Sequence, residues 1–152
     1  YDWLFTTPTM LITTISYFIF LKYKHANVDT STLSIVNIVK KELWTILSII
    51  FLNAVMLLFG FLNEIKKIDT HLAVTLGTIA FFAYFYIIYK QYVVGVEGTD
   101  TIFYVFFTLW SLYGVAALLP YDWKNISYNI LDLFSKNFFG VFITLVLYGY
   151  VK

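Results

Sequence analysis

Hydrophobic residues occupy the chain in five long stretches, and most charged residues lie between these stretches. A helix needs about 20 apolar residues to cross a bilayer, and a chain in lipid must satisfy its backbone hydrogen bonds internally. We therefore predict an all-α protein, a transmembrane helical bundle with five spans. The predicted spans cover about residues 1–22, 42–64, 71–91, 100–120 and 126–150.

The composition supports a membrane protein and excludes other classes. Hydrophobic residues make up 61% of the 152 residues and charged residues 12%, whereas soluble domains have about 45–50% apolar and about 25% charged residues. These values exclude a disordered chain, a nucleic-acid-binding protein and an ordinary cytosolic enzyme. Cysteine is absent, which excludes thiolate metal sites and cysteine nucleophiles. We expect no metal site and no enzymatic activity.

The lysines predict how the chain is oriented in the membrane. The first and third loops and the C-terminal tail hold six lysines, and the second and fourth loops hold three. Cytoplasmic loops carry the excess of basic residues, so we place the first loop, the third loop and the C-terminus in the cytoplasm. The expected location is the cell membrane.

The first loop contains a possible helix start. The run from Asp29 to Thr32 can cap a helix, and apolar residues follow it up to Lys40 and Lys41. One interpretation is a short helix on the membrane surface. The other is an extension of the second span, and the sequence favours neither.

Two opposite charges lie inside the last predicted span. Asp132 and Lys136 are four residues apart, so they share one helix face. A lysine at mid-bilayer costs about 2.5–3.5 kcal/mol on insertion scales. The pair is either a structural lock or the site of a functional amine, in a Schiff base or on an ion path.

The first span supplies a second group of polar residues. Asp2 is followed one turn later by Thr6, and Pro8 interrupts the helical hydrogen bonding. The Thr6 hydroxyl lies on the same face as Asp2 and can hydrogen-bond its carboxylate.

These residues resemble the microbial rhodopsins. Residues 1–8 (YDWLFTTP) resemble the third helix of that family, and residues 131–140 (LDLFSKNFFG) resemble the seventh. Met56 and Gly60 resemble residues of the family's fourth helix that contact retinal. Trp110 and Tyr113 resemble the tryptophan and tyrosine of its sixth helix that pack on the retinal. The resemblance covers all five predicted spans, as helices three to seven. The sequence around Lys136 is also similar to rhodopsins of large algal viruses and marine plankton.

The resemblance assigns roles to the charged residues. It implies that Lys136 binds retinal covalently as a protonated Schiff base. Asp2 would be the primary counterion and proton acceptor, Asp132 the second carboxylate, and Thr6 would tune Asp2. Side chains expected to contact the retinal are Trp3, Thr7, Met10, Met56, Gly60, Tyr84, Trp110, Tyr113 and Asp132. A slip of one helical turn would replace Tyr84 by Phe81.

Two departures from the family affect the expected function. Its first two helices have no counterpart here, so we expect the sequence to be a fragment of a seven-helix retinal protein, residues 1–152 being a partial domain. Thr13 stands where proton pumps carry an acidic proton donor, which suggests a slow pump, a sensor or a channel.

We favour a retinal-binding, light-driven ion transporter that moves protons outward. A sensory photoreceptor and a light-gated channel are alternatives within the family. A membrane scaffold without photoactivity, in which Asp132 and Lys136 are only structural, is the alternative outside it. Homo-oligomers are possible, and no nucleic-acid partner is expected.

Overall fold

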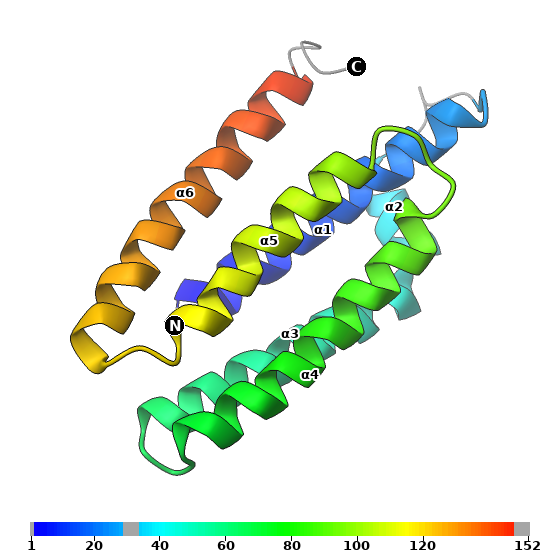
Figure 1. Ribbon diagram of the computed structural model, residues 1–152. Helices are drawn as coiled ribbons and strands as arrows, with labels where there is room; N and C mark the ends of the chain where they lie inside the picture. Colours follow the sequence, from blue (N-terminus) through cyan, green and yellow to red (C-terminus); the bar gives the residue numbers. More distant parts are fainter. Residues whose placement is uncertain (1, 29–33, 148–152) are drawn as a thin grey trace. The chain divides into compact units, whose positions relative to one another are not determined.

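The computed structural model describes residues 2–28 and 34–147, and every regular element in them is a helix (Figure 1). The predicted all-α fold is confirmed. The elements are α1 (Asp2–His25), α2 (Ile35–Lys41), α3 (Leu43–Glu64), α4 (Thr70–Ile88), the π-helical segment η1 (Tyr89–Val93), α5 (Asp100–Ala116) and α6 (Tyr121–Leu147).

The chain divides into two compact units, residues 1–104 and 105–152. The first unit contains α1 to α4, η1 and the first residues of α5, and the second contains the rest of α5 and α6. Within the first unit, α3 and α4 pack along each other, and α1 contacts α3 and η1. Small residues form the α4 side of the α3–α4 contact: a Cβ added at Gly77 would lie 3.8 Å from Met56 Cγ.

Hydroxyl side chains in α1 bond back to their own helix. Six of them donate to the carbonyl oxygen four residues earlier, at 2.7–3.1 Å. They belong to Thr6, Thr7, Thr9, Thr13, Thr14 and Ser16. This bonding satisfies the hydroxyl donors without a partner from another helix, so the polar residues do not prevent α1 from packing through Ile15 and Phe18, both almost fully buried.

Side-chain caps and glycines fix the turns at the two ends of α4. The Asp69 carboxylate accepts hydrogen bonds from the backbone N–H of His71 (2.7 Å) and Leu72 (3.4 Å) at the start of the helix. At the other end α4 continues into η1, and the chain then turns through Gly95 and Gly98, whose φ values of 78° and 82° favour glycine.

The segment before α3 forms a separate short helix, α2. It ends at Lys41, and Glu42 has a non-helical conformation between α2 and α3. The structure therefore favours the short-helix interpretation over a plain extension of the second span. The observed cap is Ser34, whose side chain accepts from the Asn37 N–H at 3.2 Å. The expected capping run, residues 29–32, lies outside the described residues.

Three helices of the described chain are long and apolar enough to cross a membrane. They are α1, α3, and α4 continued through η1 (Thr70–Val93). The apolar helix α5 is shorter, and α6 carries Asp132 and Lys136 along its length. The five-span arrangement stays a prediction.

Aromatic contacts join α5 and α6 within the second unit. The Phe106 ring on α5 lies 6.5 Å from that of Phe138, 5.8 Å from that of Phe139 and 6.5 Å from that of Phe142. These are edge-on contacts, the arrangement that aromatic rings prefer. They join α5 to α6 about two helical turns from Tyr113, which belongs to the candidate site.

Candidate functional site

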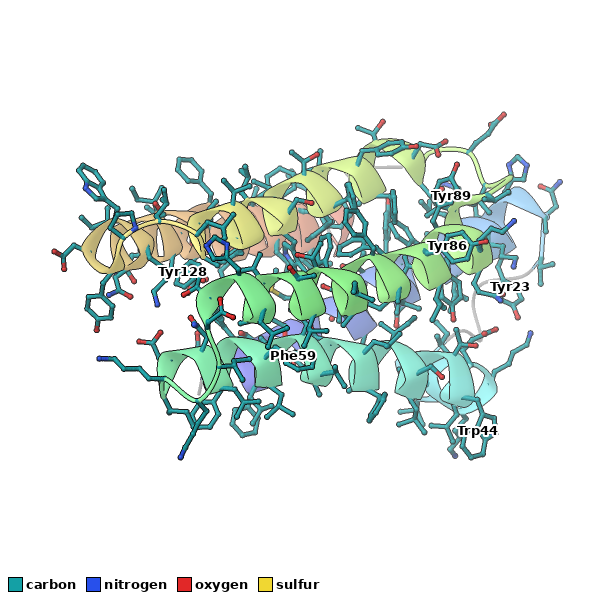
Figure 2. The ribbon with its side chains drawn as sticks, turned by 60° about the horizontal axis from the view of Figure 1, so that its bottom comes forward. Tyr23, Trp44, Phe59, Tyr86, Tyr89 and Tyr128 are labelled. Carbon is teal, nitrogen blue, oxygen red and sulfur yellow. The ribbon has the colours of Figure 1, made fainter. Side chains whose placement is uncertain are left out.

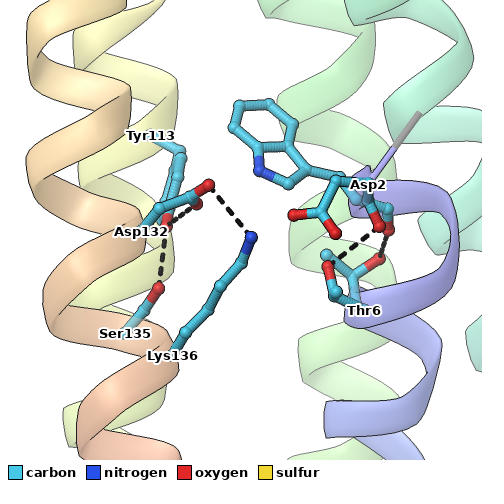
Figure 3. Close-up of polar contacts among 8 residues, drawn as sticks. Asp2, Thr6, Tyr113, Asp132, Ser135 and Lys136 are labelled. Carbon is cyan, nitrogen blue, oxygen red and sulfur yellow. Dashed lines mark hydrogen bonds and ion pairs between the residues drawn. The ribbon is translucent and has the colours of Figure 1, made fainter.

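A charged and hydrogen-bonded cluster links α5 to α6 (Figure 3). The Lys136 ammonium lies 3.1 Å from Asp132 Oδ2, one helical turn away. The Tyr113 hydroxyl on α5 donates to Asp132 Oδ1 at 2.7 Å. One carboxylate therefore accepts from a lysine and a tyrosine at the same time, one on each oxygen.

Ser135 extends this cluster in one direction. Its Oγ lies 2.8 Å from the Tyr113 hydroxyl oxygen, and the side chain is 3% exposed. A phenol has a single hydrogen. Because Tyr113 directs its hydrogen to the carboxylate, Ser135 acts as the donor to Tyr113. The resulting sequence of donors runs from Ser135 through Tyr113 to Asp132.

Sequence reasoning missed Ser135, although three predicted site residues, Tyr113, Asp132 and Lys136, are brought together. The missed signal was small. A serine directly before Lys136 lies about 100° from it around the helix, toward the neighbouring helix rather than on the Lys136 face. Only the position of α5 reveals that its hydroxyl meets Tyr113.

The polar residues of α1 form a separate set in the first unit. The Thr6 hydroxyl donates to the main-chain oxygen of Asp2 at 3.1 Å (Figure 3). Its single hydrogen is directed to the backbone, so the expected bond from Thr6 to the Asp2 carboxylate is wrong. The cause is the i−4 carbonyl, which lies within reach of any threonine in a helix.

Thr7 makes the contact between α1 and α3. Its hydroxyl donates to the Trp3 main-chain oxygen at 2.7 Å and accepts from Asn53 Nδ2 at 2.8 Å. Asn53 is 0% exposed, and its Oδ1 has no hydrogen-bond partner among the described residues. Sequence reasoning missed Asn53 too. Its signal was an amide in an apolar span, three residues before Met56 and on the same face.

The residues expected at the ring end of the retinal lie together on α3 and α4. The buried Tyr84 hydroxyl contacts Met56 Sδ at 3.8 Å. The alternative residue, Phe81, is also buried, and its ring lies 5.5 Å from that of Tyr84. Of the other expected contacts, Met10 and Trp110 are buried, whereas a Cβ added at Gly60 would meet nothing within 4 Å.

The cluster on α5 and α6 offers a primary amine next to a carboxylate. Among the described residues, no group of three or more His, Cys, Asp or Glu side chains could hold a metal ion. Lys136 instead offers a primary amine beside an anion, with Trp110 three residues before Tyr113 on α5. A large apolar aldehyde would find in these groups an amine, a counter-charge and an aromatic wall.

The sequence profile of a family described as bacteriorhodopsin-like protein matches residues 1–149. The chain belongs to this family. The bacteriorhodopsin-like assignment makes it a microbial rhodopsin and an integral membrane protein, in agreement with the resemblance and with the apolar helices. Members of the family are generally transporters or photoreceptors rather than enzymes, and they generally bind retinal through a lysine.

A solved structure supports the same assignment. The chain is similar to "Crystal structure of viral rhodopsin OLPVRII", with 28% sequence identity and a TM-score of 0.79. The match covers 99% of this chain and 66% of that one, so this microbial rhodopsin chain spans just under two thirds of the length of its relative. A comparison with curated proteins gave no significant match.

Proposed function

We propose that this chain binds retinal covalently at Lys136 and works as a light-driven ion transporter that moves protons outward. The observation that carries the proposal is the cluster of Lys136, Asp132 and Tyr113. Retinal bound there through a Schiff base would absorb light, and the proton affinity of the Schiff base would change on isomerisation. The chain's own groups would hold the ligand and receive the proton.

Each carboxylate has a distinct part in this proposal. Asp132 balances the positive charge at Lys136, and the donors Tyr113 and Lys136 fix its orientation. The side chains of Asp132 and Lys136 are only partly buried, and a cation shielded from water needs such a partner because an unpaired charge in a low-dielectric site is costly. Asp2, in the first turn of α1, is the proposed primary counterion and proton acceptor, in line with the family resemblance.

Aromatic and sulfur-containing side chains would enclose the rest of the ligand. Trp3 and Trp110 are the proposed walls along the polyene, and rigid aromatic faces supply large contact areas at low entropic cost. Met56 and Tyr84, already in contact with each other, are the proposed neighbours of the ring. Met10 is the proposed contact from α1.

The proposal is tested by the colour of the protein supplied with all-trans retinal. The wild-type protein should absorb visible light, and Lys136→Ala should not. Lys136→Arg is the matched control: it keeps the positive charge beside Asp132 but has no primary amine to form an imine. We expect Lys136→Arg to fold and to stay colourless. Visible absorption with covalently bound retinal in either variant would contradict the assignment.

A sensor or a channel is the second candidate, and Thr13 favours it. The Thr13 hydroxyl donates to the Thr9 main-chain oxygen at 2.8 Å, and a threonine hydroxyl is too weak an acid to replace a carboxylic proton donor. Proton uptake without an internal donor is slow, which suits signalling or passive conduction. Recording light-induced current under voltage clamp separates the functions: a pump gives current at zero driving force, a channel does not, and a sensor gives none.

A further inference from the structure

The end of α2 and the start of α3 carry an outward-facing stripe that the proposed function does not use. The stripe consists of Lys40, Trp44, Leu47 and Phe51, spaced by four, three and four residues, which places them on one helix face. Backbone hydrogen bonds carry this face across the junction between α2 and α3: Glu42 N–H donates to the Ile38 oxygen and Ile46 N–H to the Glu42 oxygen, both at 2.9 Å.

All four side chains of the stripe are exposed. Trp44 is 81% exposed, Leu47 44% and Phe51 67%, and Figure 2 shows Trp44 on the side of α3 away from α4. Asn53 and Ile49, on the opposite face of α3, are fully buried. The stripe therefore belongs to the outer surface of the first unit.

The order of chemistry along the stripe matches the layers of a membrane leaflet. A cation comes first, then an indole, then aliphatic and aromatic hydrocarbon. Tryptophan concentrates at the level of the headgroups, and lysine extends from there toward phosphates. A second helix shows the same order at the same end, because exposed Tyr86 on α4 is followed four residues later by exposed Lys90.

Lys40 lies on a helix that is held in place, and no described residue neutralises its charge. The α2 helix is fixed to the first unit through buried Ile38. The ammonium of the neighbouring Lys41 donates to the Tyr23 hydroxyl, and this hydrogen bond raises the pKa of Lys41 above its ordinary value. Glu42 accepts from Tyr92 at 3.3 Å. Among the described residues, the ammonium of Lys40 has no such partner.

We propose that this stripe binds an anionic phospholipid, with the phosphate at Lys40, the glycerol region at Trp44 and an acyl chain along Leu47 and Phe51. The charge of Lys40 selects an anionic headgroup over a zwitterionic one, and the exposed hydrocarbon below it accepts the chain. An anionic lipid should be enriched there about fivefold, the effect of one lysine near a membrane surface. The predicted cytoplasmic position of this end agrees with the leaflet where anionic lipids concentrate.

Brominated lipids test the proposal, because bromine quenches tryptophan fluorescence on contact. The protein is placed in phosphatidylcholine bilayers that contain an equal small fraction of brominated phosphatidylglycerol or brominated phosphatidylcholine. The difference between wild type and Trp44→Phe gives the signal of Trp44 alone. We expect this signal to be quenched several-fold more by the brominated anionic lipid.

Three variants decide whether Lys40 is responsible. Lys40→Gln should abolish the preference and Lys40→Glu should reverse it. Lys67→Gln, which removes an exposed lysine beyond the opposite end of α3, should leave it unchanged. Equal quenching by the two lipids in the wild type, or a full preference in Lys40→Gln, would overturn the proposal. Quenching by neither lipid would overturn it as well, since a second copy or another protein would then cover the stripe.

Discussion

The buried side-chain amide of Asn53 has a hydrogen-bond partner for its nitrogen but none among the described residues for its oxygen. Its Nδ2 donates to Thr7, while its Oδ1 finds no donor among the described residues. An unsatisfied buried polar atom costs about 1–3 kcal/mol. Burying Asn53 therefore costs free energy at its Oδ1, and the hydrogen bond from its Nδ2 to Thr7 offsets part of that cost. Removing Thr7 and removing Asn53 should therefore change the stability by different amounts.

Substitutions of the two partners should have unequal effects on stability. Thr7→Val removes the only acceptor described for the Asn53 amide nitrogen, so we expect it to destabilise the protein by about 1–3 kcal/mol. Asn53→Leu removes the amide altogether and leaves Thr7 donating to Trp3, so we expect it to be nearly neutral. Denaturant unfolding in detergent micelles measures both.

The double variant supplies the control. Thr7→Val combined with Asn53→Leu should be more stable than Thr7→Val alone, because no orphaned amide remains. An Asn53→Leu variant as unstable as Thr7→Val would show that the amide contributes more than its single described bond.

At the residue scale, the sequence predicts which chemical groups are present better than it predicts which partners their hydrogen bonds reach. Asp132 and Lys136 form the expected pair because four-residue spacing in a helix determines their proximity. The Thr6 hydroxyl donates its one hydrogen to the main-chain oxygen of Asp2, which competes with the Asp2 carboxylate for it. Ser135 depends on where α5 lies, which no local pattern encodes.

At the scale of elements, close contact between α3 and α4 depends on small side chains. Gly77, with buried Ala73 and Ala80 on the same helix, lets the α4 backbone approach Met56. Helices in membranes associate through this kind of packing, since lipid supplies no hydrophobic force between them. The size of the residue at position 77 should therefore limit how closely the helices approach.

Gly77→Ala and Gly77→Leu should differ sharply. An added Cβ would lie 3.8 Å from Met56, an ordinary contact distance, so alanine should be tolerated. Leucine would overfill the contact between α3 and α4, and overpacking costs about 1–3 kcal/mol of stability. Thermal unfolding followed by circular dichroism measures the difference. Gly114→Leu on α5 is the matched control, because a Cβ there meets nothing within 4 Å; an equal loss in Gly114→Leu would contradict the packing argument.

Helix positions followed from hydrophobic patterning, but two local features did not. The pattern cannot distinguish a π-helical segment such as η1 from the end of an α-helix, because the two differ by one residue in hydrogen-bond register. The break at Glu42 was also undecided, since the apolar spacing of α2 continues into α3.

At the scale of the whole molecule, the proposed proton transport depends on where the returning proton comes from. Asp2 lies in the first turn of α1, whereas Thr13 lies three turns further along the same helix. Its hydroxyl is held by the Thr9 carbonyl. The proposed cycle must therefore take its proton from water on the cytoplasmic side.

The late photocycle should slow as pH rises. Its rate should fall about tenfold per pH unit wherever bulk protons limit it, because the Thr13 hydroxyl is too weak an acid to donate the proton. Thr13→Asp should restore a donor, accelerate this phase and flatten its pH dependence, and Thr13→Val should leave both unchanged. Flash photolysis at several pH values makes the comparison. A wild-type decay that is fast and independent of pH would contradict the inference and identify another donor.

The six hydroxyls of α1 that bond to their own backbone have a consequence for biosynthesis. Each donates its hydrogen to a carbonyl oxygen one turn earlier, so the hydroxyl donor is already satisfied within the helix. The insertion machinery at the ribosome exit selects segments by how readily they partition into lipid. Once coiled, α1 is therefore a more apolar segment for this machinery than its count of threonines suggests.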